Sequence, residues 1–351
     1  MASSRPKVVL ACSQRVHEVY TTPPDLERLQ AFADWEWVAC EKELANDEQE
    51  IAHLIDRLKD ADGLVVCGGA PHISADIMAQ APKLRIIGDM EADRFAARIA
   101  VEAAWERGIR TVDTTNGSSY PVAEWALALI LISLRNAGAL FRRIIAGNYG
   151  KTYDDPGYLR GELVGKRVGL IGCGHIGRRL ITYLKPFDVE IWVYDPYLPK
   201  EMADALGFLL TSLENLLSQS NVIVCLAPIT PRTHRMIGQR ELDLIPSGAV
   251  LVNVSRGAII DPDALVARLK RGDIIAGLDV FDPEPIPADS EIIHLDNVFL
   301  SPHIAGVTAA GAPRMFTLMV DELDRFFHGH ETFFDLTPRS IANRRGSKPQ
   351  R

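Results

Sequence analysis

The feature that most constrains the fold of this chain is a set of three glycines spaced G-x-G-x-x-G. Gly172, Gly174 and Gly177 follow the apolar segment 168–171 and precede a stretch typical of a helix start. In such a strand–turn–helix unit the first glycine permits the turn, the second lets the backbone approach a pyrophosphate, and the third lets the helix pack on the strand. The segment therefore predicts a dinucleotide site, with an ordinary glycine turn as the alternative.

The next apolar segment favours the dinucleotide. It spans residues 190–194 and ends at Asp195, 18 residues after Gly177. A carboxylate at this spacing accepts hydrogen bonds from the ribose hydroxyls of NAD and repels the 2′-phosphate of NADP. Residues 196–198 contain no arginine that would bind such a phosphate. The sequence therefore predicts NAD as the cofactor.

The composition is that of a globular protein with two domains. The chain has 351 residues, of which 47% are hydrophobic and 24% charged, and this length is enough for two cores. The formal net charge of −8 argues against nucleic acid or an anionic membrane as the main partner. Five widely spaced cysteines fit neither a disulfide framework nor a zinc site, and the apolar residues 8–12 are too few for a signal peptide. We expect a cytoplasmic protein without a metal.

A long apolar run, residues 122–132, follows Pro121. It is shorter than the roughly 20 residues that cross a bilayer and contains Glu124, so no membrane span is predicted. Because the run is apolar on nearly every face, it predicts a helix buried on two sides, between domains or in the interface of a homodimer. Burial in the core of one domain is the alternative.

Two series of short apolar runs alternate with helix-like stretches and predict two parallel sheets. The runs of the first series are residues 8–12, 35–40, 63–67, 84–88 and 111–113. The six runs of the second series are residues 168–171, 190–195, 221–227, 248–255, 274–280 and 297–301. An amphipathic segment, residues 313–327, is long enough to return the chain to the first domain.

The predicted fold class is therefore α/β, with two doubly wound parallel-sheet domains. Residues 1–120 and 307–337 form a flavodoxin-like substrate domain, and residues 121–306 form a Rossmann NAD-binding domain inserted into it. The basic tail, residues 338–351, lacks apolar periodicity and is predicted to be disordered, with an interaction segment as the alternative.

Two loops of the first domain are considered for substrate binding, because parallel sheets bind ligands beyond the carboxyl ends of their strands. Gly68 and Gly69 expose backbone N–H groups that can grip a small carboxylate, and a plain turn is an equal alternative. The charged residues 89–94 are more typical of a solvated helix start.

Three loops after strands of the second series supply a cation, a carboxylate and an imidazole: Arg256, Glu284 and His303. Reduction of a 2-oxo acid needs these groups, because a guanidinium binds the carboxylate while a histidine passes a proton to the oxygen. Taken singly, each has a structural alternative: a surface salt bridge, a solvated turn acid and a histidine bonded to its own loop. Their placement after successive strands carries the hypothesis, with Asp282 as a competitor of Glu284.

These motifs resemble those of the D-isomer-specific 2-hydroxyacid dehydrogenase family over nearly the whole chain, to about residue 334. The resemblance is carried by residues 172–177, 227–233, 252–257, 279–285 and 302–306. It implies that Arg256 binds the substrate carboxylate and that His303 is the general acid and base. It also implies that Glu284, just before the second proline of its loop, holds the imidazole and favours its protonated form. A homodimer is in keeping with the same family.

The resemblance also implies the cofactor contacts. The backbone at His175 and Ile176 would meet the pyrophosphate, and Asp279 would meet the nicotinamide carboxamide. The full set of implied cofactor-binding residues is Gly172, Gly174, His175, Ile176, Gly177, Asp195, Pro228, Thr233, Val254, Asp279 and Gly306.

Departures from the family pattern leave the substrate open. Residues 67–70 lack the basic or hydroxyl side chain that would bind a phosphorylated substrate, no regulatory domain follows, and residues 89–94 put acids near the expected pocket. The predicted function is an NAD-dependent oxidoreductase that interconverts a 2-oxo acid and a D-2-hydroxy acid between two closing domains. The alternatives are an NAD(H)-sensing protein resembling the family's corepressors and an enzyme that oxidises an unusual anion such as phosphite.

Overall fold

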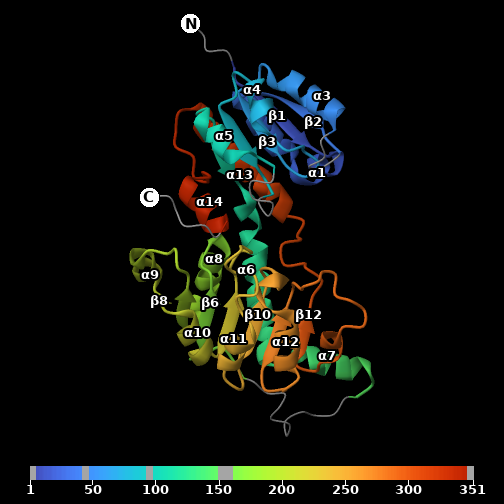
Figure 1. Cartoon of the computed structure of the whole chain (residues 1–351), viewed down its shortest axis with the longest axis vertical. Coiled ribbons are helices and arrows are strands. Elements are labelled where there is room, and N and C mark those ends of the chain that lie inside the picture. Colours follow the sequence, from blue (N-terminus) through green and yellow to red (C-terminus); the bar gives the residue numbers. More distant parts are fainter. Residues whose placement is uncertain (1–4, 42–46, 92–97, 149–160, 346–351) are drawn as a thin grey trace. The chain divides into compact units, whose positions relative to one another are not determined.

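The computed structural model describes residues 5–41, 47–91, 98–148 and 161–345, without the side chains of residues 343 and 344. The chain forms two compact units (Figure 1): the first is Met1–Ser118 with Ala309–Ala342, and the second is Ser119–Thr308. The second unit is therefore inserted into the first. The boundaries expected from the sequence, 120/121 and 306/307, lie two residues from the observed ones.

Unit 1 is built on a five-stranded parallel sheet in the order β2-β1-β3-β4-β5, which is the flavodoxin-like order. Its elements are β1 (Lys7–Cys12), α1 (Gln14–Tyr20), α2 (Pro23–Phe32), β2 (Asp34–Ala39), α3 (Glu48–Leu58), β3 (Gly63–Val66), α4 (Ala75–Ala79), β4 (Ile86–Asp89), α5 (Val101–Glu106), β5 (Arg110–Asp113), η2 (Thr115–Ser118), α13 (Gly311–Phe327) and α14 (Pro338–Arg345).

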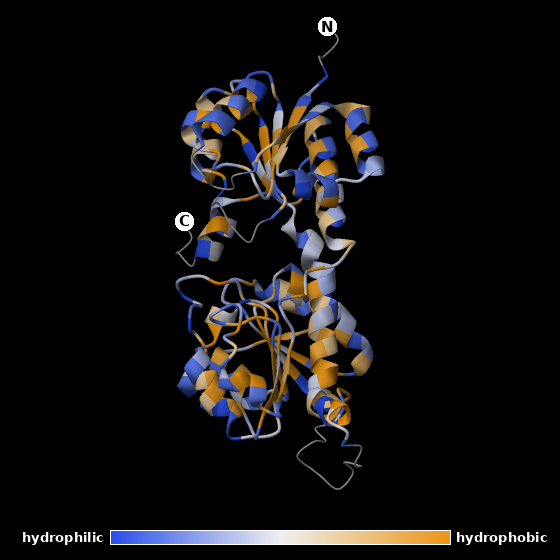
Figure 2. Ribbon diagram, turned by 90° about the vertical axis from the view of Figure 1, so that its right-hand side faces the viewer, coloured by the Kyte–Doolittle hydropathy of each residue, from blue (hydrophilic) through white to orange (hydrophobic). Residues whose placement is uncertain are grey.

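Both faces of this sheet are buried, because successive side chains of a strand point to opposite sides. Val8 and Leu10 pack in a cluster with Phe316 of α13. Val9 and Ala11 pack in a second cluster that contains residues of α3, α4 and α5. Figure 2 shows the result as apolar strands between helices whose outer faces are polar. The alternating apolar runs of the sequence thus form a sheet that is covered by helices on both faces.

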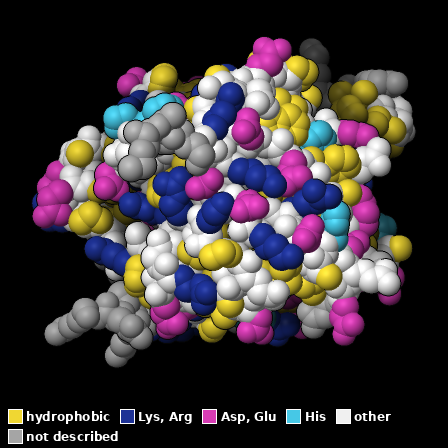
Figure 3. All heavy atoms as spheres, turned by 90° about the horizontal axis from the view of Figure 1, so that it is seen from above, with side chains coloured by type: hydrophobic (Ala, Val, Ile, Leu, Met, Phe, Trp, Pro, Cys, Tyr) yellow, Lys and Arg dark blue, Asp and Glu magenta, His cyan; other side chains and the backbone are white. Residues whose placement is uncertain are grey.

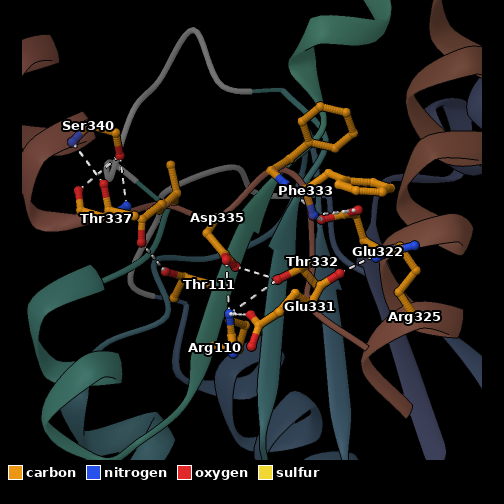
Figure 4. A network of polar contacts seen from close by, with 12 residues as sticks. Arg110, Thr111, Glu322, Arg325, Glu331, Thr332, Phe333, Asp335, Thr337 and Ser340 are labelled. Atoms are coloured by element: carbon orange, nitrogen blue, oxygen red, sulfur yellow. Dashed lines mark hydrogen bonds and ion pairs between the residues drawn. The ribbon is translucent and has the colours of Figure 1, made fainter. Parts of the chain in front are cut away.

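The edge strand β5 is covered by a C-terminal strap, residues 329–337, which follows α13. The strap pairs with β5 in the antiparallel direction, with Asp113 N–H donating to Phe334 O at 2.9 Å and Leu336 N–H to Thr111 O at 2.8 Å. The fully buried carboxylate of Glu322 accepts the N–H groups of Phe333 and Phe334 (Figure 4). Burial raises the pKa of Glu322. Pairing and covering an edge in this way protects its free backbone groups.

The prediction of a disordered tail is wrong for its first eight residues, which form α14. Thr337 and Ser340 cap this helix reciprocally, since Thr337 N–H donates to Ser340 Oγ at 2.8 Å and Ser340 N–H to Thr337 Oγ1 at 3.1 Å. Ile341 is buried in the cluster on the α3–α5 side. Two adjacent apolar residues, Ile341 and Ala342, are too few to show helical periodicity in the sequence. Residues 346–351 lie outside the described part of the chain.

Surface charges of both signs are mixed. On the face drawn in Figure 3, Lys and Arg side chains are interspersed with Asp and Glu. Lys83 and Asp60 form an ion pair of this kind at 2.7 Å, and both side chains are exposed. Exposed pairs of this kind contribute little to stability, because water screens both charges. The net charge of −8 is therefore not gathered on this face.

Unit 2 is built on a seven-stranded parallel sheet in the order β12-β11-β10-β9-β6-β7-β8. Its elements are α6 (Ser119–Leu134), α7 (Ala137–Ile145), β6 (Arg167–Ile171), α8 (His175–Leu184), η3 (Lys185–Phe187), β7 (Glu190–Tyr194), α9 (Lys200–Leu206), β8 (Leu209–Leu210), α10 (Leu213–Gln219), β9 (Val222–Cys225), α11 (Gln239–Leu244), β10 (Val250–Asn253), η4 (Gly257–Ile259), α12 (Pro262–Leu269), β11 (Ile275–Leu278), η5 (Glu291–His294) and β12 (Val298–Leu300).

This order is the Rossmann order extended by one strand. The sequence predicted six strands, and the seventh is β8, whose two residues are too short to produce an alternating pattern. β6 lies between β7 and β9, so the chain leaves it in one direction and later returns on its other side. The carboxyl end of β6 is therefore the topological switch point, where open α/β sheets bind ligands.

Helix α6 contains the long apolar run and covers one face of this sheet together with α8. It begins at Ser119, so Pro121 is the third residue of the helix instead of the first. With η2 it makes a 20-residue segment, Thr115–Leu134, whose length and composition would suit a membrane span, and 56% of its most apolar window is buried in the structure. Core helices of folded domains meet the same test.

Candidate active site

The glycine turn after β6 has the backbone that the sequence predicted. Gly172 has a φ of +92°, its N–H donates to Tyr194 O at 2.8 Å, and a Cβ there would lie 2.9 Å from the backbone of Ala227. A Cβ on Gly177 would lie 3.1 Å from Gly172 O. The positive φ and the close approach of Ala227 require glycine at position 172, and the close packing of α8 on the turn favours glycine at position 177.

The middle glycine differs, because a Cβ on Gly174 would meet nothing within 4 Å. Gly174 is the N-cap of α8 and makes no side-chain hydrogen bond to the helix. The first residues of α8, His175 and Ile176, thus present their backbone at a helix N-terminus, where an anion is stabilised by N–H groups and by the helix dipole. The open space and the uncapped helix fit the pyrophosphate of a dinucleotide.

Asp195 directly follows β7 and holds the glycine turn. Its Oδ2 accepts the N–H of Cys173 at 3.0 Å, and its Oδ1 accepts the N–H of Tyr197 at 3.0 Å. An ionised carboxylate has about four acceptor positions, so two remain for the hydroxyls of a ribose. Asp195 fits the predicted cofactor contact and has a structural function that the sequence did not reveal.

The loops after β9 and β10 lie at the same end of the sheet. Thr233 Oγ1 donates to Pro228 O at 2.6 Å and closes a tight turn, while Pro228 is exposed. Val254 is 5% exposed and belongs to the core. Gly257 belongs to the motif 252–257 but was given no role of its own in the sequence prediction, and it packs so closely that a Cβ would stand 1.9 Å from the backbone of Phe281. This contact joins the loop of Arg256 to the loop that carries Glu284.

Arg256 is half-buried and its Nη1 donates to Ser255 O at 2.5 Å. Burial lowers the pKa of its guanidinium, and the charge of Glu284 opposes this shift. Arginine remains protonated in proteins. The loop after β10 therefore carries a fixed positive charge next to a carboxylate of the neighbouring loop.

His303 and Glu284 form the central pair of the site, with 2.6 Å between Nδ1 and Oε1. Their side chains are 43% and 35% exposed, so a small molecule can reach them. Since Nδ1 faces the carboxylate, Nε2 is the ring nitrogen left for proton exchange. His303 has a φ of +54°, an uncommon conformation for a non-glycine residue that occurs often at functional sites. Of the two acids considered, Glu284 contacts His303.

Asp279 lies deeper than its expected contact with nicotinamide would suggest. Its side chain is 0% exposed, and it accepts hydrogen bonds from Ser301 Oγ, from Ile304 N–H at 3.1 Å and from Ala305 N–H at 2.9 Å. Gly306 follows, and a Cβ there would have ordinary contact with Val122 at 3.6 Å. Asp279 thus anchors the loop that carries His303. Ser301 was missed by the sequence prediction, although it stands just before the Pro-His motif.

In unit 1, Gly69 is a structural glycine. Its φ is +98°, and a Cβ would lie 2.0 Å from Cys40 O. A Cβ on Gly68 would lie 3.3 Å from Glu91 Oε2, so a carboxylate lies over this part of the loop. Both glycines are buried, and the plain-turn interpretation is sufficient to explain Gly69.

The described acids of the charged segment, Asp89 at the end of β4 and Glu91 just after it, belong to an ion-pair cluster around a buried arginine. Asp89 is 4% exposed and lies 3.4 Å from the fully buried guanidinium of Arg98, which also binds Glu91 at 2.8 Å. Glu91 in turn accepts the hydroxyl of Tyr20 at 2.7 Å. Burial raises the pKa of Asp89 to about 7. Residues 92–94 of the segment lie outside the described residues.

Comparison with known proteins identifies the family. Residues 127–305 match the NAD binding domain of the D-isomer specific 2-hydroxyacid dehydrogenases. A glyoxylate reductase from Pyrococcus horikoshii is 32% identical over 310 residues, which are 87% of this chain and 90% of that protein. The chain belongs to the D-isomer-specific 2-hydroxyacid dehydrogenase family. It is an NAD-dependent oxidoreductase of 2-hydroxy or 2-oxo acids.

Two further relatives of this dehydrogenase bear on its fold and length. A D-3-phosphoglycerate dehydrogenase from Methanocaldococcus jannaschii is 36% identical over 278 residues, which are 79% of this chain but only 52% of that protein. A phosphoglycerate oxidoreductase from Rhizobium etli has a structure that matches with a TM-score of 0.81 at 26% identity, over 95% of this chain and 98% of that one. The chain thus spans about half of the first relative and nearly all of the second.

Proposed function

We propose that this dehydrogenase interconverts a small 2-oxo acid and a D-2-hydroxy acid, with Arg256, Glu284 and His303 as its catalytic residues. The observation that carries the proposal is the 2.6 Å contact between His303 and Glu284 on loops that follow β12 and β11. Arg256, on the loop after β10, supplies the positive charge that a carboxylate substrate needs.

Each residue has a distinct task. Arg256 binds the substrate carboxylate and polarises the carbonyl. His303 gives the proton from Nε2 to the carbonyl oxygen during reduction and takes it back during oxidation. Glu284 keeps Nδ1 protonated and the ring oriented, as a carboxylate does in other acid–base pairs. NAD(H), when bound, accepts or supplies the hydride.

The cofactor would lie across the carboxyl end of the unit 2 sheet. The turn and helix residues that would hold its pyrophosphate are Gly172, Gly174, His175, Ile176 and Gly177. The remaining contacts would come from the loops that follow the other strands: Asp195, Pro228, Thr233, Val254, Asp279 and Gly306. Support comes from the open space at Gly174, the uncapped N-terminus of α8 and the free acceptor positions of Asp195.

The substrate is proposed to be a small, unphosphorylated 2-oxo acid such as glyoxylate. Several relatives of which this chain covers 85% to 90% are named glyoxylate reductase. In unit 1 the carboxylate of Glu91 lies beside Gly68, where a phosphate group would be repelled. The same carboxylate would repel the carboxylate of a substrate, so we assign that group to Arg256 and not to the buried backbone N–H groups of Gly68 and Gly69.

The test is NADH oxidation with glyoxylate, hydroxypyruvate, pyruvate, phenylpyruvate and phosphohydroxypyruvate. We expect turnover with at least one of the first four and weaker turnover with the phosphorylated acid. Silence with the whole panel would contradict the proposed reaction. A preference for phosphohydroxypyruvate would contradict only the substrate class.

A cytoplasmic homodimer is part of the proposal. On α6, Leu127 and Leu131 are only partly buried, and on α7 the side chains of Phe141, Ile144 and Ile145 are 63%, 53% and 70% exposed. A second copy of the chain would cover such an apolar face. All five cysteines are free and buried, which suits a reducing compartment. Sedimentation should show a dimer, and Ile145→Glu should weaken it.

A further inference from the structure

One buried carboxylate, that of Asp279, holds the loop that carries His303 in place. His303 directly follows Pro302 in the loop after β12 and has a left-handed backbone, with a φ of +54°. A conformation of this kind persists only where its surroundings hold it. The two residues after His303 provide the hold, because the N–H groups of Ile304 and Ala305 both donate to Asp279.

Asp279 is fixed in turn by a polar chain that begins on another helix. Ser301 Oγ lies 2.5 Å from Asp279 Oδ1, and Trp125 Nε1 lies 3.0 Å from Ser301 Oγ. Ser301 is 5% exposed and Asp279 is 0% exposed. Water therefore has little access to compete for these hydrogen bonds.

The direction of each hydrogen bond in this chain is determined by chemistry. A carboxylate can only accept, so Ser301 donates its hydroxyl proton to Asp279. An indole N–H can only donate, so Ser301 accepts from Trp125. The hydrogen bonds thus run from Trp125 as donor, through Ser301, to Asp279 as the final acceptor. Bonds that run in one direction at low dielectric polarise and strengthen one another.

We propose that Trp125 and Ser301 are positioning residues for the imidazole of His303, acting through Asp279. Trp125 lies on α6, 176 residues before Ser301, and no local motif joins the two. This series of hydrogen bonds connects α6, the first helix of unit 2, to the loop that carries His303, the proposed proton donor. This inference rests on the proposed catalytic function of His303.

Loss of one of these hydrogen bonds should displace the loop after β12 slightly and leave the rest of the site folded. Glu284 reaches His303 from a separate loop, so the pair at 2.6 Å can form only while the loop after β12 holds the ring in place. A small displacement of a proton donor lowers the rate of the chemical step more than the affinity for ligands. The expected signature is a lower kcat with nearly unchanged NADH affinity.

The experiment compares Trp125→Phe and Ser301→Ala with a matched control, Trp192→Phe. Trp192 is also in unit 2 and donates its indole N–H to Glu190 at 2.8 Å, away from the His303 loop. We expect kcat to fall about 3-fold to 10-fold for Trp125→Phe and about 10-fold or more for Ser301→Ala. The double variant should be no slower than Ser301→Ala alone, because both substitutions break one chain. Trp192→Phe should keep the wild-type kcat.

A second readout needs no turnover. In protein labelled with ¹³C and ¹⁵N in its histidine rings, the His303 signals are assigned by their absence in His303→Asn. We expect them to shift in Trp125→Phe and Ser301→Ala and to stay in place in Trp192→Phe. Trp125→Phe keeps an aromatic ring in the same space, so it serves as the test if Ser301→Ala does not fold.

The outcomes separate this inference from the proposed function. If the wild type reduces no 2-oxo acid, the proposed function fails, and the His303 signals still decide whether the chain orients the ring. If Trp125→Phe and Ser301→Ala lower only the melting temperature, with kcat and the His303 signals as in the wild type, the inference is overturned.

Discussion

The carboxyl ends of the two sheets differ in how their loops are held. In unit 2, the loop after β6 is shaped by its own backbone: Gly172 permits the turn and Gly177 lets α8 pack closely on it. The carboxylate of Asp195 accepts an N–H group of this turn, and Gly174 leaves open space in front of the N-terminus of α8. In unit 1, the corresponding end is filled by the buried side chain of Arg98 and its partners. The carboxyl end of the unit 2 sheet is therefore shaped by backbone conformation, and that of the unit 1 sheet by buried charged side chains. The difference explains why the first can be recognised as a motif and the second cannot.

The largest effect is expected in unit 2, at the proposed proton donor. His303→Asn should lower kcat about 10²-fold to 10⁴-fold, the usual contribution of a general acid, while the Kd for NADH changes about 2-fold or less. Stopped-flow kinetics and fluorescence titration measure the two quantities. The matched control in unit 1 is His328→Asn, because His328 also pairs with a carboxylate, Asp324 at 2.8 Å. If kcat fell equally in both variants, the assignment of the proton donor to His303 of unit 2 would be contradicted.

Glycine substitutions test whether the two edges have different purposes. Gly69→Ala places a Cβ 2.0 Å from Cys40 O at a φ of +98°, so we expect a loss of about 2 kcal/mol or more in stability and an unchanged Kd for NADH. Gly174→Ala meets nothing within 4 Å, so we expect an unchanged melting temperature and a Kd for NADH raised about 10-fold. Calorimetry and titration of both variants would show the reverse pattern if the assignment is wrong.

The preference for NAD over NADP tests the cofactor-binding role proposed for Asp195. Asp195→Ala should narrow the preference for NAD over NADP about 10-fold, because the carboxylate that repels the 2′-phosphate is removed. The ratio of kcat/KM for the two cofactors measures this. Asp204→Ala is the control, since Asp204 is exposed in the same unit and pairs only with Lys200 among the described residues. An unchanged ratio in Asp195→Ala would contradict the assignment.

The smallest effect is a pH dependence of stability that belongs to unit 1. Burial raises the pKa of Asp89 from 3.8 to about 7. Between these values the folded protein keeps a proton that the unfolded chain releases, so stability falls as pH rises from about 4 to 7 and levels off above 7. The slope is at most about 1.4 kcal/mol per pH unit, the value for one proton. Urea unfolding between pH 5 and 8 measures it.

The comparison variants for this slope are Asp89→Asn and Asp76→Asn. Asp89→Asn removes the titrating group, so the stability should vary less between pH 5 and 7, whatever its absolute value. Asp76 is an exposed acid of α4 in the same unit, so its replacement should leave the slope as in the wild type. A steep slope that survives in Asp89→Asn would place its origin elsewhere.

Much of the fold could be predicted from the sequence because its signals are local. The apolar runs of 4 to 6 residues that became β1, β3 and β6 are recognisable by their composition, and the glycine spacing marks the turn after β6. The two residues of β8 and the helix α14 were missed, because their stabilising contacts come from distant segments.

By itself, the sequence determined the two α/β sheets, the dinucleotide turn and the order of Arg256, Glu284 and His303 along the chain. The tertiary structure showed the contact between Glu284 and His303 that the family resemblance implied, and it alone showed that Trp125 reaches Ser301. It alone showed Arg98 buried between Asp89 and Glu91. The physical reason is distance along the chain. Backbone demands and strand periodicity act over a few residues, whereas these polar contacts join separate segments and leave no periodic trace in the sequence.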